Sequence, residues 1–364
     1  MTEKLLETNE KYLEKLQQSV KEITSANEQL FKGLNTFMNL DATGTNKTER
    51  ELVYTEDKLK LFHYAKRTRT QHKVPTLIVY ALVNTPAMMD IQEDRSFIKN
   101  LLEGGTDIYL IEWGYPTPED KYLTLEDYIQ GYINNAVDFI RKENGVDKVN
   151  VVGICQGGTF STIYTALNPE KVQNLVTIVT PIDFSTNDGL LFKWAKHLNV
   201  DNMVEAFGNI PGDFMNTGFL TLKPITLMVN KYLDLIDDLD DSNAIANFLR
   251  MEKWIFDSPD QAGETFRQFV NDMYHDNKLI KGELVIGGKK VDLKNINMPL
   301  LNLYALKDNQ VPNAASADFE KYVSSLDKET HKINTGHIGM FVGSRSQKEV
   351  APLISNWLKE RSKR

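Results

Sequence analysis

The apolar and polar positions of the first forty residues follow the rhythm of a helix. Apolar side chains recur there in alternating steps of three and four, while Glu and Lys occupy the opposite face. This spacing is typical of a helix that packs along one side. The helix either docks on a partner chain or packs on its own domain, and the pattern fits both equally. Polar residues 41–48 indicate a linker, so residues 1–48 are predicted to form a helix and linker. The apolar positions are Leu6, Leu13, Leu16, Val20, Ile23, Leu30, Leu34 and Phe37, with Asn9 and Asn27 in the same frame.

Beyond residue 49 the rhythm changes to short apolar runs, rich in β-branched residues, that alternate with helical spacing such as Phe160–Asn168. Runs that are apolar on both faces and separated by helices predict a mostly parallel sheet with helices on both of its faces. We expect this α/β core to comprise residues 49–183 and 295–364. The predicted strands are Thr76–Val83, Asp107–Trp113, Lys148–Ile154, Leu175–Thr180 and Leu300–Ala305, with a sixth near Lys332–Asn334.

Residues 184–294 interrupt this alternation with a segment rich in Phe, Met, Trp and Leu. Helical spacing recurs at Lys223–Leu239 and Ala244–Phe256, and Gly282–Leu293 is typical of a hairpin around Gly287 and Gly288. An insertion of this length between two late strands predicts a cap over the edge of the sheet.

Composition and charge narrow the classes of function. The formal net charge of −8 argues against nucleic-acid binding. The longest apolar runs have strand length, so no transmembrane segment is expected. A single cysteine excludes an internal disulfide and fits a reducing cytoplasm. The acidic run at residues 237–241 does not have the spacing of a calcium loop, and we expect no metal. One basic cluster could contact phosphates, although a solvated loop is the commoner arrangement; it consists of Lys66, Arg67, Arg69, His72 and Lys73.

The strongest chemical signal is the sequence Gly153-Ile154-Cys155-Gln156-Gly157. It follows an apolar strand and precedes a helical pattern, as in a G-x-S-x-G nucleophile elbow with Cys in place of Ser. Gly153 and Gly157 leave room for the close packing of strand and helix. These features predict an α/β-hydrolase fold with Cys155 as nucleophile. The oxyanion hole is expected to use the backbone N–H of Gln156 and that of either Val83 or Asn84, in the loop after an earlier strand.

An acid and a histidine follow the nucleophile in the order that this fold uses. Asp308 comes directly after the strand Leu300–Ala305, and His337 lies between two glycines just after the last predicted strand. His197, His275 and His331 are less well placed. The residues therefore predict a Cys-His-Asp acyltransferase or hydrolase, in which His337 deprotonates Cys155. Asp308 either orients His337 or acts on a second substrate.

From about residue 70 onward the chain resembles the catalytic subunit of two-subunit polyhydroxyalkanoate synthases, which belong to the α/β-hydrolase superfamily. The resemblance is carried by Gly153–Gly158, by the cap segment Asn247–Asp260, by Gly336-His337-Ile338-Gly339, and by Asp308 with Val311-Pro312. Members of that family often have His directly after the aspartate, where this chain has Asn309. That difference suggests a subtype and leaves the three catalytic candidates in place.

The resemblance implies that the chain polymerises (R)-3-hydroxyacyl-CoA, mostly short-chain, into polyester with release of CoA. Cys155 would carry the acyl chain, and Asp308 would act on the incoming 3-hydroxyl. It implies a smaller second subunit, association with cytoplasmic polymer granules, and no cofactor beyond the CoA of the substrate. Two alternatives stay open. One is a cysteine hydrolase, such as a thioesterase, a depolymerase or a dienelactone-hydrolase-like enzyme; the other is a non-catalytic granule-surface protein.

Overall fold

The computed structural model describes residues 48–223, 231, 233, 235 and 241–362. The chain divides into two compact units: residues 1–44 with 223–252, and residues 45–222 with 253–364. The units change between residues 222 and 223 and between residues 252 and 253, both within the predicted cap insertion. The limits of that insertion stay a prediction. The helix predicted at the N-terminus lies outside the described residues. In the first unit, Lys231 and Glu252 form an ion pair at 2.6 Å, and α9 (Ser242–Phe256) begins there.

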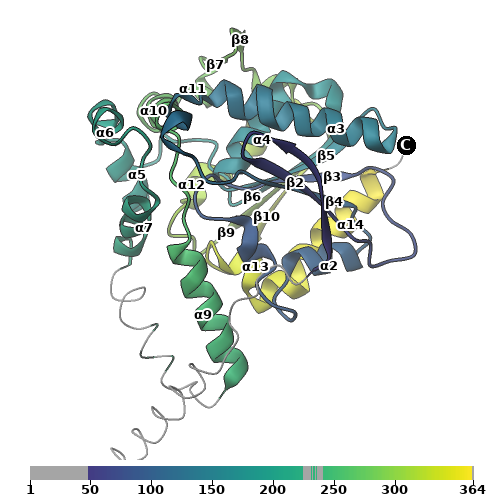
Figure 1. Ribbon diagram of the computed structural model, residues 1–364. Coiled ribbons are helices and arrows are strands. Elements are labelled where there is room, and N and C mark those ends of the chain that lie inside the picture. The colour runs from purple at the N-terminus through teal and green to yellow at the C-terminus, as the bar shows by residue number, and fades with distance from the viewer. Residues whose placement is uncertain (1–47, 224–230, 232, 234, 236–240, 363–364) are drawn as a thin grey trace, which may run out of the picture. The chain divides into compact units, whose positions relative to one another are not determined.

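The second unit is built on an eight-stranded sheet in the order β1-β2-β4-β3-β5-β6-β9-β10 (Figure 1). From β4 to β10 all neighbouring strands are parallel, whereas β1, β2 and β4 pair antiparallel. The predicted α/β-hydrolase fold, with its mostly parallel sheet, is thus confirmed. The strands are β1 (Arg50–Glu56), β2 (Leu59–Tyr64), β3 (Thr76–Val79), β4 (Ile108–Glu112), β5 (Val149–Ile154), β6 (Val172–Ile178), β9 (Leu300–Ala305) and β10 (Lys328–Ile333).

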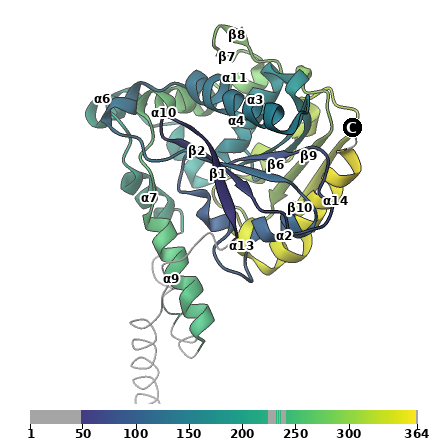
Figure 2. The same cartoon turned by 45° about the vertical axis from the view of Figure 1, so that its right-hand side comes forward.

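Helices cover both faces of this sheet. Figures 1 and 2 show α3 (Asn134–Asn144) and α4 (Gln156–Leu167) on one face, and α2 (Phe97–Glu103) and α14 (Ala351–Arg361) on the other. The central strands are buried along their whole length because they are covered twice. Consequently only the ends of the strands are free to carry a site. Shorter helices complete the unit: α5 (Leu190–Ala195), α6 (Val200–Phe207), α7 (Gly212–Thr221), α10 (Gly263–Phe269), α11 (Lys278–Lys281), α12 (Asn313–Ser316) and α13 (Gly339–Val342).

The structure departs from the sequence prediction at one edge of the sheet and in its centre. The antiparallel pair β1–β2 was not predicted, and β3 ends at Val79, four residues before the predicted end. The hairpin predicted around Gly287 and Gly288 is confirmed, as β7 (Val285–Ile286) pairs antiparallel with β8 (Lys289–Lys290). No helix in the described ranges is long and apolar enough to cross a bilayer.

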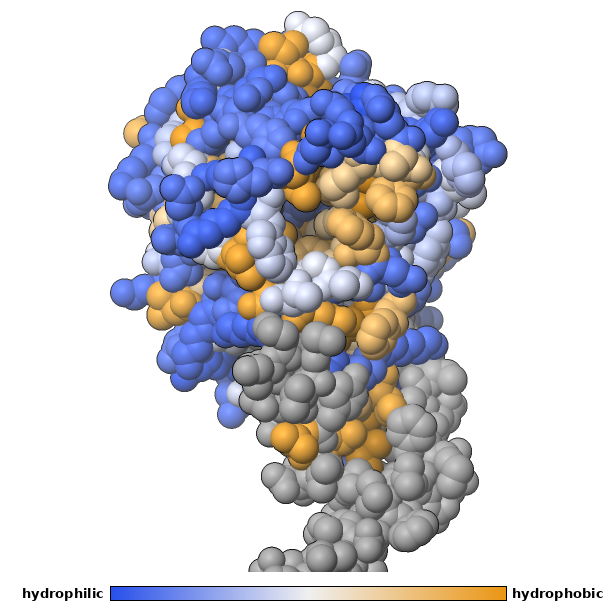
Figure 3. All heavy atoms as spheres, turned by 90° about the vertical axis from the view of Figure 1, so that its left-hand side faces the viewer, coloured by the Kyte–Doolittle hydropathy of each residue, from blue (hydrophilic) through white to orange (hydrophobic). Residues whose placement is uncertain are grey.

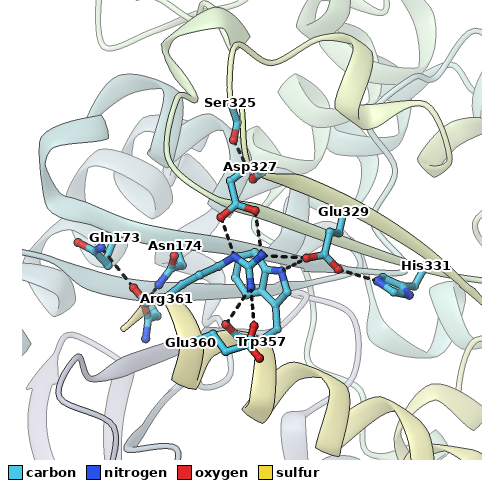
Figure 4. Close-up of polar contacts among 10 residues, drawn as sticks. Gln173, Asn174, Ser325, Asp327, Glu329, His331, Trp357, Glu360 and Arg361 are labelled. Atoms are coloured by element: carbon cyan, nitrogen blue, oxygen red, sulfur yellow. Dashed lines mark hydrogen bonds and ion pairs between the residues drawn. The ribbon is translucent and has the colours of Figure 1, made fainter. Parts of the chain in front are cut away.

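A polar network fastens α14 to the edge strand β10 (Figure 4). Arg361 contacts both carboxylate oxygens of Asp327, at 2.8 and 2.9 Å, and Glu329 at 2.9 Å. Trp357 donates its indole N–H to Glu329 at 3.1 Å, and the Arg361 guanidinium lies over the Trp357 ring. The network steadies the strand that leads towards His337.

Candidate active site

Cys155 stands at the turn between β5 and α4, in a backbone conformation that few residues adopt. Its φ is 53° and its ψ is −126°, outside the regions that L-residues ordinarily occupy. Its N–H donates to the carbonyl of Ile178 on the neighbouring strand at 3.0 Å. The side chain is half-buried. The sharp turn therefore presents the thiol at the carboxyl edge of the sheet, the geometry of a nucleophile elbow.

The glycines around Cys155 allow the strand and helix to pack at this turn. A Cβ on Gly153 would lie 2.5 Å from the Cα of Gly158, and one on Gly157 would collide with the carbonyl oxygens of Val79 and Tyr80. The first turn of α4 thus rests directly on the end of β3. Any side chain at Gly157 would push the helix, and with it the thiol, away from the sheet.

Asp308 and His337 reach the same edge from two adjacent parallel strands. Asp308 follows β9, His337 follows β10, and the two strands pair along their whole length. His337 Nδ1 and Asp308 Oδ2 are 2.7 Å apart, and their side chains are 9% and 2% exposed. Asp308 Oδ1 accepts the backbone N–H groups of Gln310 and Val311 at 2.8 and 2.9 Å. Both carboxylate oxygens are therefore engaged within the protein.

The pKa of His337 depends on both Asp308 and Cys155, so the three predicted residues belong to one site. Burial lowers the pKa of His337, but the carboxylate of Asp308 and then the charge of Cys155 raise it, each also through a hydrogen bond, to a net value of about 10. Since Nδ1 faces Asp308, Nε2 is the nitrogen left for the sulfur. The structure brings Cys155, His337 and Asp308 into one hydrogen-bonded chain, the arrangement of a nucleophile, a base and a residue that orients the base.

The loop after β3 carries the predicted oxyanion donors. Because β3 is the parallel neighbour of β5, this loop and the elbow lie at the same edge of the sheet. The N–H of Leu82 already donates to the side chain of Gln156 at 3.1 Å, which ties the loop to the first residue of α4. Asn84 has a φ of 58°, so the chain turns sharply there. Gln156, Val83 and Asn84 thus all lie at the edge of the sheet that carries the thiol, and the choice between the last two stays open.

Two tyrosines near the thiol escaped the sequence analysis. Burial first, and then the charge of Cys155, raise the pKa of both Tyr80 and Tyr274. Tyr274 belongs to an aromatic cluster with Phe184, Phe192 and Phe269, at ring separations of 4.9 to 6.0 Å. The only signal in the sequence was the aromatic composition of the insertion, which does not identify a particular ring.

The other histidines and the basic cluster lie away from the elbow. His331 is on β10 and contacts Glu329 at 3.1 Å, and His275 bonds to Asn271 and to the carbonyl of Ala195, both at 3.0 Å. His197 is exposed. The basic cluster of residues 66–73 precedes β3, and thus lies towards the opposite edge of the sheet from the thiol. That position gives no support to a phosphate contact beside Cys155.

Comparisons with known proteins agree with this geometry. A family model described as the alpha/beta hydrolase fold matches residues 55–344, and one described as the N-terminus of poly-beta-hydroxybutyrate polymerase (PhaC) matches residues 1–101. A protein of Allochromatium vinosum, named poly(3-hydroxyalkanoate) polymerase subunit PhaC, is 52% identical over 93% of this chain and 96% of its own. Proteins of the same name from Thiocystis violacea and Synechocystis are 51% and 47% identical over 96% and 95% of this chain, and 98% and 94% of their own.

Among solved structures, a thermophilic esterase from Thermogutta terrifontis aligns over 86% of this chain and 100% of its own, with a TM-score of 0.50 and 13% identity. At that identity the likeness concerns the fold, because one fold carries many chemistries.

Proposed function

The chain belongs to the poly(3-hydroxyalkanoate) polymerase family, and we propose that it lengthens polyester by passing 3-hydroxyacyl units from CoA thioesters through Cys155. It is a polymerase of the acyltransferase type. The observation that carries the proposed route is the hydrogen-bonded chain Cys155–His337–Asp308 at the edge of the sheet.

In the first step Cys155 takes an acyl group from the CoA thioester. His337 accepts the thiol proton, Sγ attacks the carbonyl carbon, and the oxyanion lies against the N–H groups of Gln156 and of Val83 or Asn84. When the intermediate collapses, the bond to the CoA sulfur breaks and the leaving thiolate takes the proton from His337. The product is an acyl thioester on Cys155 and free CoA.

In the second step the 3-hydroxyl of another 3-hydroxyacyl-CoA attacks that thioester. His337 accepts the hydroxyl proton, an ester bond forms, the bond to Sγ breaks, and the proton returns to sulfur. The lengthened acyl-CoA can then acylate Cys155 again. We assign the base in both steps to His337 because Asp308 is 2% exposed and both of its oxygens are engaged. Asp308 then acts by holding His337, and not on the substrate hydroxyl.

The assembly and location of the enzyme are part of the same proposal. The relatives are named as subunits, which supports a smaller second subunit for this chain as well. Binding to the surface of cytoplasmic polymer granules is supported by apolar side chains on the face that carries α5, α6 and α7 (Figure 3). Exposed apolar residues on these helices are Leu190, Trp194, Phe207 and Phe214. CoA enters as part of the substrate and leaves as a product, so no resident cofactor is needed.

The test is to incubate the purified chain with (R)-3-hydroxybutyryl-CoA, with and without the smaller subunit, beside Cys155→Ala. CoA release and the product are both measured. Polymer that depends on Cys155 supports the proposal, and dependence on the second subunit supports the assembly. Free 3-hydroxybutyrate in an amount equal to the CoA released would make the chain a hydrolase that uses the same site.

A further inference from the structure

The side chain of Asn84 leaves the loop after β3 and binds the end of α9. Its Nδ2 lies 2.7 Å from Ser258 Oγ, and 3.3 Å from the carbonyl oxygens of both Trp254 and Ile255. The side-chain amide of Asn84 thus donates to three oxygens of residues 254–258. We call residues 254–258 the latch segment. Asn84 is 170 residues distant in sequence from Trp254, so the contact joins two remote parts of the same compact unit.

Further hydrogen bonds hold the latch segment against the loop after β3. Trp254 donates its indole N–H to the carbonyl of Thr85 at 2.7 Å. Ser258 donates to Asn216 Oδ1 at 2.9 Å, and Asn216 returns a bond to the carbonyl of Ile255 at 2.6 Å. Trp254 and Asn216 are 6% and 5% exposed. Bonds shielded from water in this way hold their partners more firmly than exposed ones.

The backbone at Asn84 needs such support. A φ of 58° is uncommon for residues other than glycine, although Asn tolerates it better than most. Residues 82–85, here called the oxyanion turn, are held on one side by the bond from Leu82 N–H to Gln156 and on the other by the latch segment. The amides that would receive the oxyanion lie between these two attachments.

We propose that Asn84 is a positioning residue that ties the oxyanion turn to the latch segment, so that the oxyanion donor of this turn, the N–H of Val83 or Asn84, is in place only while residues 254–258 are docked. This inference rests on the acyl transfer proposed above. The side chain of Asn84 acts on the direction of backbone N–H groups and touches no reacting atom. Loosening of the latch segment lowers the rate of acyl transfer and leaves the thiol–imidazole pair intact.

Three variants distinguish the effect of the Asn84 side chain from that of its backbone conformation. Asn84→Gly removes all three contacts and keeps a residue that adopts positive φ freely. Asn84→Asp keeps the shape but points a carboxylate oxygen at the carbonyl oxygens of Trp254 and Ile255, which repel it. Tyr115→Phe is the matched control: it deletes a hydrogen bond to the same segment, from Tyr115 OH to Asp257 at 2.8 Å, on an exposed side chain away from the turn.

The experiment measures kcat and KM for CoA release from (R)-3-hydroxybutyryl-CoA, and in parallel the rate at which iodoacetamide alkylates Cys155. Alkylation needs the thiolate but no oxyanion hole, so it reports the nucleophile alone. We expect kcat to fall about tenfold to a hundredfold in Asn84→Gly and further in Asn84→Asp, since a lost oxyanion donor costs about a hundredfold or more. Alkylation in these variants, and kcat in Tyr115→Phe, should stay within about twofold of wild type.

Two results would overturn the inference. One is an Asn84→Gly enzyme with the wild-type kcat; the other is a loss of alkylation in parallel with kcat, which would mean that the whole site had collapsed. The proposed function is judged separately by whether wild type makes polymer or free acid. The ratio of variant to wild-type rates is informative whether the product is polymer or free acid, because polymerisation and hydrolysis pass through the same oxyanion.

Discussion

Cys155 combines two demands that conflict within one residue. It must stand clear of the helix to reach a substrate, yet its φ of 53° and ψ of −126° cost roughly 1–3 kcal/mol for a residue other than glycine. The surrounding contacts hold it there: Gly157 lets α4 press on the carbonyl end of β3, and the N–H of Cys155 is bonded to Ile178. The strain is therefore maintained by packing that tolerates no added atom at Gly157.

This packing predicts the effect of Gly157→Ala. The new Cβ would collide with two backbone carbonyl oxygens, which cannot rotate away as a side chain would. We expect the variant to lose about 1–3 kcal/mol of stability through overpacking. We also expect it to lose about a hundredfold in kcat, because the thiol is displaced. Thermal unfolding and CoA release measure the two effects.

Gly131→Ala is the control, since a Cβ there meets nothing within 4 Å. It should leave kcat unchanged and gain up to about 1 kcal/mol of helix stability. If Gly157→Ala and Gly131→Ala have the same stability and the same kcat, the close approach at Gly157 is not what positions the thiol.

A further prediction at the residue scale concerns His337, whose protonation depends on the charge of Asp308. Because burial lowers the pKa of His337 and Asp308 is the largest influence that raises it, Asp308→Asn should bring that pKa down from about 10. By NMR, the wild-type imidazole should not titrate between about pH 6 and 8, whereas the variant should approach the ordinary range. We expect kcat to fall about a hundredfold or more, as for the loss of a catalytic base.

The control for this experiment is Glu329→Gln, which alters another carboxylate–histidine pair, with His331, outside the site. It should leave the His337 signal in place. A His337 signal that is the same in wild type and in Asp308→Asn would show that the carboxylate does not hold the proton.

At the scale of elements, the central strands were predictable because each is an apolar run with few polar interruptions. The same reasoning found Cys155, Asp308 and His337, since each directly follows a strand and parallel strands end at one edge. The edge strand β1 was missed because none of its residues, RELVYTE, is fully buried, so they form no apolar run. It is held by tertiary contacts: Arg50 pairs with Glu112 at 2.6 Å and lies over the ring of Phe62.

A loop was predicted from Val83 onward, but the strand before it was predicted too long for a related reason. Residues 80–82 are apolar and buried, which satisfies the pattern of a strand, but they leave the sheet to turn before Pro86. What the sequence did not reveal is the contact of Asn84 and Thr85 with residues 254–258, because no local pattern encodes a partner so far along the chain. The same is true of Tyr274, which the insertion brings to the thiol.

The contact between α14 and β10 gives a prediction at this scale. Arg361→Ala removes the bidentate pair with Asp327, the bond to Glu329 and the stacking on Trp357. Because these side chains are partly exposed, we expect a loss of about 1 kcal/mol, at the upper end for exposed pairs. The midpoint of thermal unfolding should then shift down by about 1–2 °C.

Arg345→Ala is the control, since among the described residues Arg345 forms one ion pair, an exposed i,i+4 contact with Glu349 at 3.3 Å. It should cost about 0.5 kcal/mol or less. Equal effects of the two variants would mean that the network adds nothing beyond isolated surface pairs.

At the scale of the whole molecule, the site couples catalysis to the stability of the fold. The pKa of His337 is 6.5 in an unfolded chain and about 10 in the folded protein. A group that binds its proton more tightly when folded stabilises the protein fully below its unfolded pKa. That stabilisation is lost as the pH rises through the folded pKa. In wild type the charge of Cys155 also raises the pKa of His337, so the contribution of Asp308 is best isolated without the thiol.

We therefore expect a pH-dependent difference in stability between Cys155→Ala and the double variant Cys155→Ala/His337→Asn. In the single variant His337 still faces Asp308, so its folded pKa should stay above 6.5 although the contribution of Cys155 is gone. Asn at 337 keeps an N–H donor towards Asp308 but does not titrate. The single variant should be the more stable by the largest margin below about pH 6.5, and the margin should shrink as the pH rises, by up to about 1.4 kcal/mol per unit.

Urea unfolding of both variants at a series of pH values measures this margin, because titrating groups remote from this pair contribute equally to the two curves. A margin that is constant with pH would mean that Asp308 does not raise the pKa of His337 without the thiolate, and that Cys155 alone holds the proton. A margin that grows with pH would reverse the sign and show that burial prevails over the carboxylate. The predicted decline would establish that Asp308 raises the pKa of His337 even without the thiolate, so that the fold itself makes the imidazole basic enough to hold the thiol proton until the departing CoA thiolate takes it.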